Sequence, residues 1–409
     1  MKVAQIHIGA GQLGLGLVMT SARAAGMEAH LVNRTTGGLG RSPSFAVIES
    51  TVDGGAARCE LEPASFSLAD HVEELHQSAL AAIDEADHLL ITTTVTTSGV
   101  RDCQGLLTGI AQRRGARRDH RGAGADFIAC ENDPGPHFKD LTEALAELGV
   151  RCLPTVVDRL CAYETDTPDL RVVRADAEAD WAIEAASPSP GLAALADGAP
   201  HVRLVDDVTP LKQQKLWLVN GAHLALGIWA RRRGLVFMRP AAGERGRVEW
   251  LEALLKEMSE PLLRLHPELG PESNCVEWGS KHIEAWLRET DETRRILKRL
   301  RRSDVGAFLD DFDLKFGSCA RKREGGPTEA PCMRSTLENL HALLTDLEKY
   351  EDFRPAADSQ DAPLELDAAK DAAAVERYRA ILGGALGLDA VALAEDLDAA
   401  FEAHRARFE

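Results

Sequence analysis

Apolar residues in the first half of the chain form short runs that alternate with stretches where they recur every three or four positions. Short runs rich in Val, Ile and Leu predict buried strands, and the longer spacing predicts amphipathic helices. The expected strands are residues 3–8, 29–33, 88–94, 126–130 and 153–157, and the expected helices are residues 13–25, 68–85 and 138–148. Such alternation builds right-handed βαβ units. The pattern therefore predicts an N-terminal α/β domain with a parallel sheet.

The spacing changes in the second half of the chain. The turn-forming run Ser187-Pro188-Ser189-Pro190-Gly191 ends the alternation. From there on, apolar positions keep a helical repeat at residues 211–231, 248–265, 280–300, 333–350 and 368–408. Because domains usually contain about 100–200 residues, we expect two of them. The sheet domain is placed at residues 1–200, and a mainly α-helical C-terminal domain at residues 201–409.

The charge balance narrows the choice of partners. The chain has 47 Lys and Arg against 65 Asp and Glu, a formal net charge of −18. A field of that sign repels phosphate backbones and anionic lipid, so neither nucleic acid nor a membrane is an expected partner. The sequence has no apolar stretch of about 20 residues that would span a bilayer, and no secretory signal at its start. We expect a cytoplasmic protein, a monomer or weak homo-oligomer, with a small-molecule substrate.

The eight cysteines do not suggest a metal site. No two of them stand in a Cys-x-x-Cys pair. Scattered cysteines in a large chain without a secretory signal are typical of reduced thiols. Since this spacing provides no zinc ligands, a zinc-dependent alcohol dehydrogenase is not expected.

A glycine-rich turn follows the first expected strand. Gly9, Gly11 and Gly14 form a Gly-x-Gly-x-x-Gly pattern that opens a helix, the context in which this motif indicates a dinucleotide-binding Rossmann domain. The three glycines allow the tight turn, the approach of a pyrophosphate and close packing of helix on strand, and the N–H groups of the helix start face the phosphates. A glycine-rich turn without a ligand is the alternative. The expected cofactor contacts are Gly9, Gly11, Gln12, Leu13, Gly14, Asn33, Arg34, Thr93 and Thr94.

The end of the second strand bears on the choice of cofactor. An Asp or Glu about 20 residues beyond the glycines would bind the ribose 2′-OH of NAD. This chain has Asn33 there, followed by Arg34. A neutral amide next to an arginine removes the repulsion that a 2′-phosphate would meet, and Arg34 could pair with that phosphate. The sequence favours NADP slightly, with Asn33 bonding the 2′-OH of NAD as the alternative.

Three polar residues interrupt an apolar helix at the start of the second domain. In an α-helix, Lys215, Asn220 and His223 would stand at about 0°, 140° and 80° around the axis, a broad face that could line one cleft. A lysine that loses solvation can act as a general base. An asparagine can donate to a developing alkoxide, and a histidine can bond a substrate hydroxyl. Taken singly, each is as well explained by an ordinary structural role.

The spacing Lys215-x4-Asn220-x2-His223 resembles the signature of the polyol-specific long-chain dehydrogenases, which include mannitol dehydrogenase and mannitol-1-phosphate 5-dehydrogenase. The glycine-rich start, the segment Cys130-Glu131-Asn132 and the segment Val157-Asp158-Arg159 resemble that family as well. The order of these stretches agrees over roughly residues 1–230. Beyond residue 230 we find no match to the family's substrate-reading segments.

The resemblance implies a metal-independent exchange between a polyol and a ketose, or between their phosphates. Lys215 would take the alcohol proton, Asn132 and Asn220 would hold the substrate oxygen, and His223 would orient the substrate. Asp158 and Arg159 would lie beside the substrate, and a hydride would pass to C4 of the nicotinamide. Because the two sets of motifs lie in different expected domains, we separately expect the nicotinamide in the cleft between those domains. One departure is Lys212, where some members carry a proton-relaying Glu.

Several alternatives stay open at this point. The basic residues within 294–302 and the group Arg321-Lys322-Arg323 could bind a substrate phosphate, although such runs are usually solvated faces. A phosphogluconate or hydroxyacid dehydrogenase has a similar two-domain plan and also uses a lysine. A dinucleotide sensor without activity would keep the fold alone. A short-chain dehydrogenase is excluded, because none of the three tyrosines begins a Tyr-x3-Lys motif.

Overall fold

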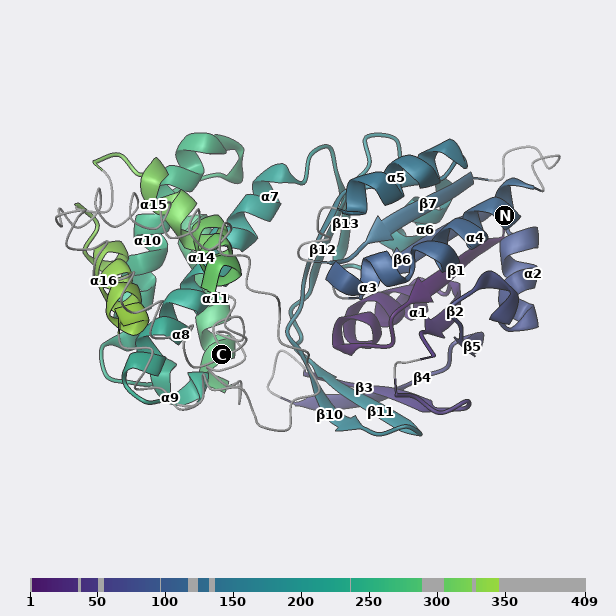
Figure 1. The fold of residues 1–409 in the computed structure, drawn as a ribbon, viewed down its shortest axis with the longest axis horizontal. Helices are drawn as coiled ribbons and strands as arrows, with labels where there is room; N and C mark the ends of the chain where they lie inside the picture. Colours follow the sequence, from purple (N-terminus) through teal and green to yellow (C-terminus); the bar gives the residue numbers. More distant parts are fainter. Residues whose placement is uncertain are drawn as a thin grey trace, which may run out of the picture. The chain divides into compact units, whose positions relative to one another are not determined.

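The computed structural model divides the chain into two compact units, Met1–Val208 and Thr209–Glu409 (Figure 1). The residues that it describes are 2–35, 38–50, 55–95, 97–116, 124–131, 137–235, 237–288, 305–325 and 329–345. The expected helix at 368–408, the basic run within 294–302 and Asn132 lie outside them. The division falls a little beyond the expected boundary at residue 200, because strand β13 (Val202–Val205) pairs with the first unit's β12 (Asp180–Glu184).

A six-stranded sheet forms the centre of the first unit. Its strands run in the order β5-β2-β1-β6-β7-β8, and every neighbouring pair is parallel. The strands are β1 (Val3–Ile8), β2 (Glu28–Asn33), β5 (Ser65–Leu68), β6 (His88–Thr93), β7 (Gly124–Ala129) and β8 (Arg151–Leu153). The chain crosses from one half of the sheet to the other beside β1, and ligands of such sheets bind at the carboxyl ends next to that point. The parallel Rossmann-like sheet confirms the predicted fold class.

Helices cover the sheet, and those at residues 14–24 and 137–147 match the expected helices at 13–25 and 138–148, whereas the helices at 97–115 and 190–198 were not predicted. They are η1 (Gly14–Met19), a π-helix that continues into α1 (Thr20–Ala24), then the 3-10 turn η2 (Val72–Glu74), α2 (Gln77–Glu85), α3 (Thr97–Asp102), α4 (Gln104–Gly115), α5 (His137–Glu147) and α6 (Pro190–Gly198). The expected helix at 68–85 was wrong in its first part, because Leu68 ends strand β5 and residues 72–74 form only the 3-10 turn η2. Only its second part is helical, as α2.

Two smaller sheets in this unit were not predicted. One has the order β10-β11-β3-β4, and the other has the order β13-β12-β9. Their further strands are β3 (Ser44–Ser50), β4 (Ala56–Leu61), β9 (Thr155–Asp158), β10 (Cys161–Asp166) and β11 (Leu170–Ala175). The strand expected at 153–157 was wrong as a single element. Pro154 separates β8 from β9, which belong to different sheets, because proline lacks the N–H that a continuous ladder needs.

The described part of the second unit is helical, as its apolar spacing predicted. Its helices are α7 (Thr209–Gln214), η3 (Lys215–Gly221), α8 (Ala222–Arg232), α9 (Met238–Ala242), α10 (Arg247–Leu265), η4 (Pro267–Leu269), α11 (Glu272–Arg288), α14 (Val305–Phe312), η5 (Asp313–Gly317), α15 (Ser318–Lys322) and α16 (Pro331–Thr345). Trp217, Phe308 and Phe312 are among the largest buried side chains of its core. Among the described helices, none has the length and apolar character needed to cross a membrane.

A buried ion network joins three strands of the large sheet at the ends where they begin. Asp126 of β7 is 1% exposed and accepts hydrogen bonds from His88 (2.9 Å), Arg151 (2.8 Å) and Ser189 (2.5 Å). Ser189 also caps the N-terminus of α6. Burial by itself would raise the pKa of Asp126, but these hydrogen bonds outweigh it and lower the pKa below the usual carboxyl value. The charged carboxylate therefore stabilises the fold.

Replacing Asp126 with Asn is expected to reduce the free energy of unfolding of the first unit by about 3 kcal/mol at neutral pH, because it leaves buried donors without their charged partner. Since the folded pKa is depressed, this contribution is complete above the ordinary carboxyl pKa and disappears as the pH falls through the lower folded value. Urea unfolding of both proteins at neutral and acidic pH measures it. Asp180→Asn is the control, because its pair with Arg203 is partly exposed and is expected to contribute less than about 1 kcal/mol. Equal losses in both variants would contradict the prediction.

Candidate active site

The turn after β1 is built so that two of its glycines cannot be replaced. Gly9 has φ +118°, and a Cβ atom there would lie 2.6 Å from the carbonyl oxygen of Thr94. A Cβ atom on Gly14 would lie 2.1 Å from the Gly9 oxygen and 2.5 Å from Thr94 Oγ1. Gly11 is different, because its nearest neighbours to a Cβ position are 3.9 Å away. This leaves room at the position where a dinucleotide pyrophosphate approaches the backbone.

A buried histidine stabilises this turn through hydrogen bonds. His7 of β1 lies within hydrogen-bonding distance of Thr92 Oγ1 (2.9 Å), the Gly9 carbonyl oxygen (3.0 Å) and Thr94 Oγ1 (3.1 Å). Burial lowers the pKa of His7 to about 4, so the ring is neutral at physiological pH. Sequence reasoning missed this residue. Gln5 and His7, polar residues inside an apolar strand, were the available signal.

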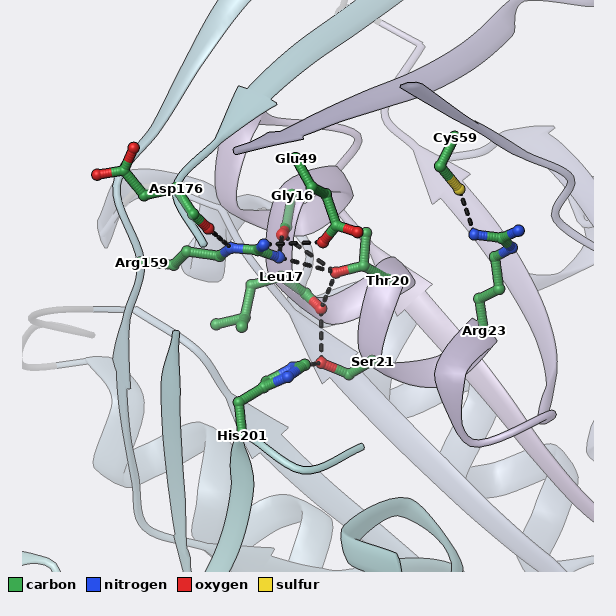
Figure 2. Close-up of polar contacts among 10 residues, drawn as sticks. All are labelled: Gly16, Leu17, Thr20, Ser21, Arg23, Glu49, Cys59, Arg159, Asp176 and His201. Atoms are coloured by element: carbon green, nitrogen blue, oxygen red, sulfur yellow. Dashed lines mark hydrogen bonds and ion pairs between the residues drawn. The ribbon is translucent and has the colours of Figure 1, made fainter. Parts of the chain in front are cut away.

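The helix that follows is held by Arg159, which the family resemblance had assigned to the substrate (Figure 2). Its guanidinium donates to the Gly16 carbonyl oxygen, to Thr20 Oγ1 (3.3 Å) and to Glu49 Oε1 (2.8 Å), and its Nε donates to the Asp176 carbonyl oxygen (2.9 Å). The side chain is 3% exposed. In the structure Arg159 therefore connects the π-helical turn η1 to the neighbouring strands.

Figure 2 also shows how the next turn of this helix is held. Ser21 Oγ donates to the Leu17 carbonyl oxygen (2.6 Å) and lies 2.6 Å from His201 Nε2. Asp158, the other residue assigned to the substrate, ends β9 opposite Asp180 and is partly exposed. Substrate contact by Asp158 or Arg159 remains a prediction, and the internal bonds of Arg159 do not favour it.

The expected adenosine side of the site contains both residues that sequence reasoning named. Asn33 ends β2, is 9% exposed, and its Oδ1 accepts a hydrogen bond from the Ala10 N–H (3.3 Å). Arg34 follows it and pairs with Asp102 (2.7 Å) and Asp70 (3.5 Å). Sequence analysis did not identify these two carboxylates, which neutralise the arginine locally.

A further acidic residue, which sequence analysis did not single out, lies at the carboxyl edge of the sheet, on the other side of β1 from Asn33. Glu131 lies two residues beyond β7 and accepts hydrogen bonds from Val95 N–H (2.9 Å) and Thr93 Oγ1 (3.1 Å). Burial raises the pKa of Glu131 to about 7. Of the two threonines expected to contact the cofactor, Thr93 holds this acid and Thr94 Oγ1 donates to the Gly9 carbonyl oxygen (3.1 Å). The position of Glu131 after a strand end was the available signal.

Three of the four expected catalytic residues lie in or next to one π-helix of the second unit. Lys215 begins η3, Asn220 is its last residue but one, and His223 lies in the first turn of α8. A π-helix bonds residue i to residue i+5, so Lys215 and Asn220 lie about one turn apart and on the same side. The α-helical angle of about 140° between them was therefore wrong. All three side chains are partly exposed, whereas Leu218, Val219 and Ala222 beside them are buried.

A second π-helix, η5, packs against η3. A Cβ atom on Gly221 would lie 2.4 Å from the Lys315 carbonyl oxygen, so η5 approaches η3 closely at this glycine. π-helical turns occur frequently at functional sites. The contact limits how far the turn that carries Lys215 and Asn220 can shift.

The basic group at residues 321–323 has internal partners. Arg321 pairs with Asp313, Arg323 donates to the Glu257 carbonyl oxygen (2.9 Å), and Lys322 lies 5.8 Å from the centre of the Trp217 ring. These contacts favour a structural role over phosphate binding. In the described part of the chain no group of three or more His, Cys, Asp or Glu lies together as a metal site would, and a metal-independent reaction remains a prediction.

Comparison with known proteins adds a relative and a shared fold. No protein-family model matches the chain. The mannitol-1-phosphate 5-dehydrogenase of Bacillus velezensis is 27% identical over 253 residues, which cover 58% of this chain and 63% of that protein. The chain therefore matches less than two thirds of the relative's length.

Two solved structures align with a larger share of this chain than the sequence relative does. A D-sorbitol dehydrogenase in substrate-free form has a TM-score of 0.58 at 16% identity, over 83% of this chain and 81% of that one. Pseudomonas fluorescens mannitol 2-dehydrogenase, in a ternary complex with NAD and D-mannitol, has a TM-score of 0.55 at 17% identity, over 97% and 94%. At this identity the two structures show a common fold. The sequence relative is thus a polyol phosphate dehydrogenase by name, and the two solved structures share the fold of this chain.

Proposed function

We propose that the chain is an oxidoreductase that uses NAD or NADP to interconvert a polyol, or its phosphate, with the corresponding ketose, as a mannitol-1-phosphate 5-dehydrogenase does. The observation that carries the proposal is the π-helix from Lys215 to Gly221, because its i, i+5 repeat brings the partly exposed Lys215 and Asn220 to one side. The name of the sequence relative supports the substrate class.

The residues of the glycine turn fit a dinucleotide. Gly9 and Gly14 fold it tightly, and the open position at Gly11 allows a pyrophosphate to approach the N–H groups at the helix start. The carboxyl edge beyond Thr93 and Glu131 belongs to the half of the sheet where the nicotinamide of such cofactors lies. When bound, the nicotinamide accepts the hydride that leaves the carbinol carbon.

Side chains of the helical unit would transfer the hydroxyl proton of the substrate and stabilise the charge on its oxygen. During oxidation Lys215 Nζ accepts the hydroxyl proton, and the electrons of the O–H bond form the carbonyl as the C–H hydride departs. Asn220 donates to the oxygen while it carries negative charge, and Asn132 provides a second donor. His223 bonds a neighbouring hydroxyl and orients the substrate. In reduction Lys215 returns the proton to the alkoxide.

The contacts of Arg34 bear on the choice between NAD and NADP. The NADP preference suggested by Asn33 and Arg34 remains a prediction, but Asp70 and Asp102 already neutralise that arginine. A 2′-phosphate carries further negative charge, which would meet two carboxylates and one guanidinium. We therefore propose NAD as the preferred cofactor, with the Asn33 amide close to the ribose.

We expect kcat/KM with NADH to exceed that with NADPH by about tenfold or more, the effect of roughly 1.4 kcal/mol of repulsion. Asp102→Asn should improve kcat/KM with NADPH several-fold and leave the value with NADH nearly unchanged. Steady-state assays with both cofactors measure this. A wild-type preference for NADPH would instead make Arg34 a phosphate-binding residue and restore the sequence-based preference.

The direct test of the function follows nicotinamide absorbance with NADH or NADPH and a series of ketoses and ketose phosphates. Turnover with a phosphorylated ketose such as fructose 6-phosphate is the expected result. Turnover with free ketoses alone would support the proposed reaction but show that the substrate carries no phosphate. Cofactor binding without turnover on any ketose would overturn the enzymatic proposal and favour a dinucleotide sensor.

A further inference from the structure

A hairpin of the four-stranded sheet reaches the glycine turn with a charged side chain. Arg171 of β11 donates from its guanidinium to the Ala10 carbonyl oxygen at 2.8 Å, and its Nε donates to Asp166 Oδ1 at 2.7 Å. Its guanidinium carbon lies 5.5 Å from the centre of the Tyr163 ring. The Arg171 side chain is only 11% exposed, although Asp166 is 43% exposed. A cation is thus held in a defined place on the turn.

A β-bulge determines which residue pairs with Arg171. The register of β10 against β11 shifts between Tyr163 and Thr165, so Asp166 stands opposite Arg171. Without the shift Thr165 would occupy that position. Bulges of this kind re-aim side chains and are frequent next to functional sites. The irregularity therefore supplies a carboxylate that orients the arginine without enclosing it.

The bond to Ala10 also orients the backbone of the turn. In a trans peptide the carbonyl of one residue and the N–H of the next point in opposite directions. When Arg171 holds the Ala10 carbonyl on the hairpin side, the Gly11 N–H points to the other side. The hairpin stays close here, since the Tyr163 hydroxyl lies 3.9 Å from the Cβ position of Gly11. Gln12 continues the contact, because its amide can donate to the Cys161 oxygen (3.2 Å) and accept from the Tyr163 N–H (3.3 Å).

Three other basic residues near the turn are either uncharged or bound to other groups. His7 is neutral because burial lowers its pKa to about 4. Arg159 binds the Gly16 carbonyl oxygen and Glu49 further along the helix. Arg34 pairs with two carboxylates at the end of β2. The formal charge of the chain is −18, so an anionic pyrophosphate needs a local cation that works against the overall field.

We propose that Arg171 supplies this cation: from the hairpin side it holds the Ala10 carbonyl, so that the Gly11 N–H faces the pyrophosphate, and its positive charge attracts the phosphates of the dinucleotide across the turn. The inference rests on the proposed dinucleotide-dependent function and names a residue of that site which lies outside the glycine motif.

The test is an equilibrium titration of the full chain and its variants with NADH and with ADP-ribose, which has the pyrophosphate but no nicotinamide. Arg171→Gln keeps a donor for the Ala10 carbonyl and removes the charge. We expect its Kd to rise about tenfold for both ligands, the size expected for one lost and partly screened charge pair. Its salt dependence should be weaker than that of the wild type. Arg171→Lys keeps the charge and should restore most of the affinity.

Two further variants separate the charge from the fold. Arg174→Gln is the matched control, because Arg174 lies on the same strand and pairs with Glu164 of β10 in a similar way; its Kd values should equal those of the wild type. Asp166→Asn removes the countercharge and should tighten binding of both ligands several-fold, an effect opposite in sign to any loss of structure.

The outcomes distinguish this inference from the function on which it rests. Wild-type binding of NADH with unchanged affinity in Arg171→Gln and Asp166→Asn would overturn the role of Arg171 and leave the dehydrogenase proposal standing. A wild-type chain that binds neither NADH, NADPH nor ADP-ribose would overturn both. A rise in Kd for NADH alone would assign Arg171 to the nicotinamide side and contradict the pyrophosphate subsite.

Discussion

Replacing Lys215 with Ala is expected to lower kcat by about 10²–10⁴-fold, the usual contribution of a general acid or base, while the Kd for NADH stays close to the wild-type value. The physical reason is that this lysine begins the π-helix of the helical unit, whereas the glycine turn belongs to the other unit. Losing the amine removes the proton acceptor and leaves the cofactor contacts in place. Steady-state kinetics with the best ketose and fluorescence titration with NADH measure the two quantities.

The control is Lys256→Ala, since Lys256 lies exposed on α10 and should keep wild-type kinetics. Added primary amines should restore part of the activity of Lys215→Ala, because a small amine can occupy the cavity and exchange the proton. A structural role would produce a different result. Loss of NADH binding, a lower unfolding temperature, or no response to amines would contradict the assignment of Lys215 as the base.

Replacing Gly14 with Ala is expected to destabilise the first unit by about 3 kcal/mol or more, at the upper end for an overpacked site. The added Cβ would lie 2.1 Å from the Gly9 oxygen, 2.5 Å from Thr94 Oγ1 and 2.6 Å from His7 Nε2. Two of these atoms belong to side chains that hydrogen bonds hold in place, and the third is backbone. The neighbours therefore cannot move aside at low cost, and we expect a lower denaturation midpoint and loss of NADH binding.

Gly11→Ala separates binding from folding. A Cβ atom there has no neighbour closer than 3.9 Å, so the variant should unfold like the wild type. Its methyl group would nevertheless occupy the path of the pyrophosphate, and we expect the Kd for NADH to rise by about tenfold or more. Gly105→Ala in α4, where nothing lies within 4 Å, should change neither quantity appreciably. A Gly11 variant that binds NADH normally would show that the dinucleotide does not use this turn.

Local patterns predicted those parts of the molecule whose physical causes are local. The six-residue strand β1 and the glycines after it were placed correctly because strand periodicity and tight turns depend on neighbouring residues. Prediction was wrong in the first part of 68–85, where Leu68 ends a strand, and at 153–157, where Pro154 separates two strands. The α-helical geometry assumed for Lys215 and Asn220 was also wrong, since a π-turn depends on tertiary packing that spacing alone does not reveal.

The sequence by itself determined the parallel α/β unit, the helical unit after it, and the residues with chemistry to offer. Only the tertiary structure determined which charged and polar groups contact one another. Arg159 and Gly16 are 143 residues apart, and Arg171 and Ala10 are 161 apart, yet each pair is joined by a hydrogen bond. The pairing of Arg34 with two carboxylates and the raised pKa of Glu131 have the same origin. Burial and ion pairing depend on neighbours in space, which residue identity and spacing do not specify.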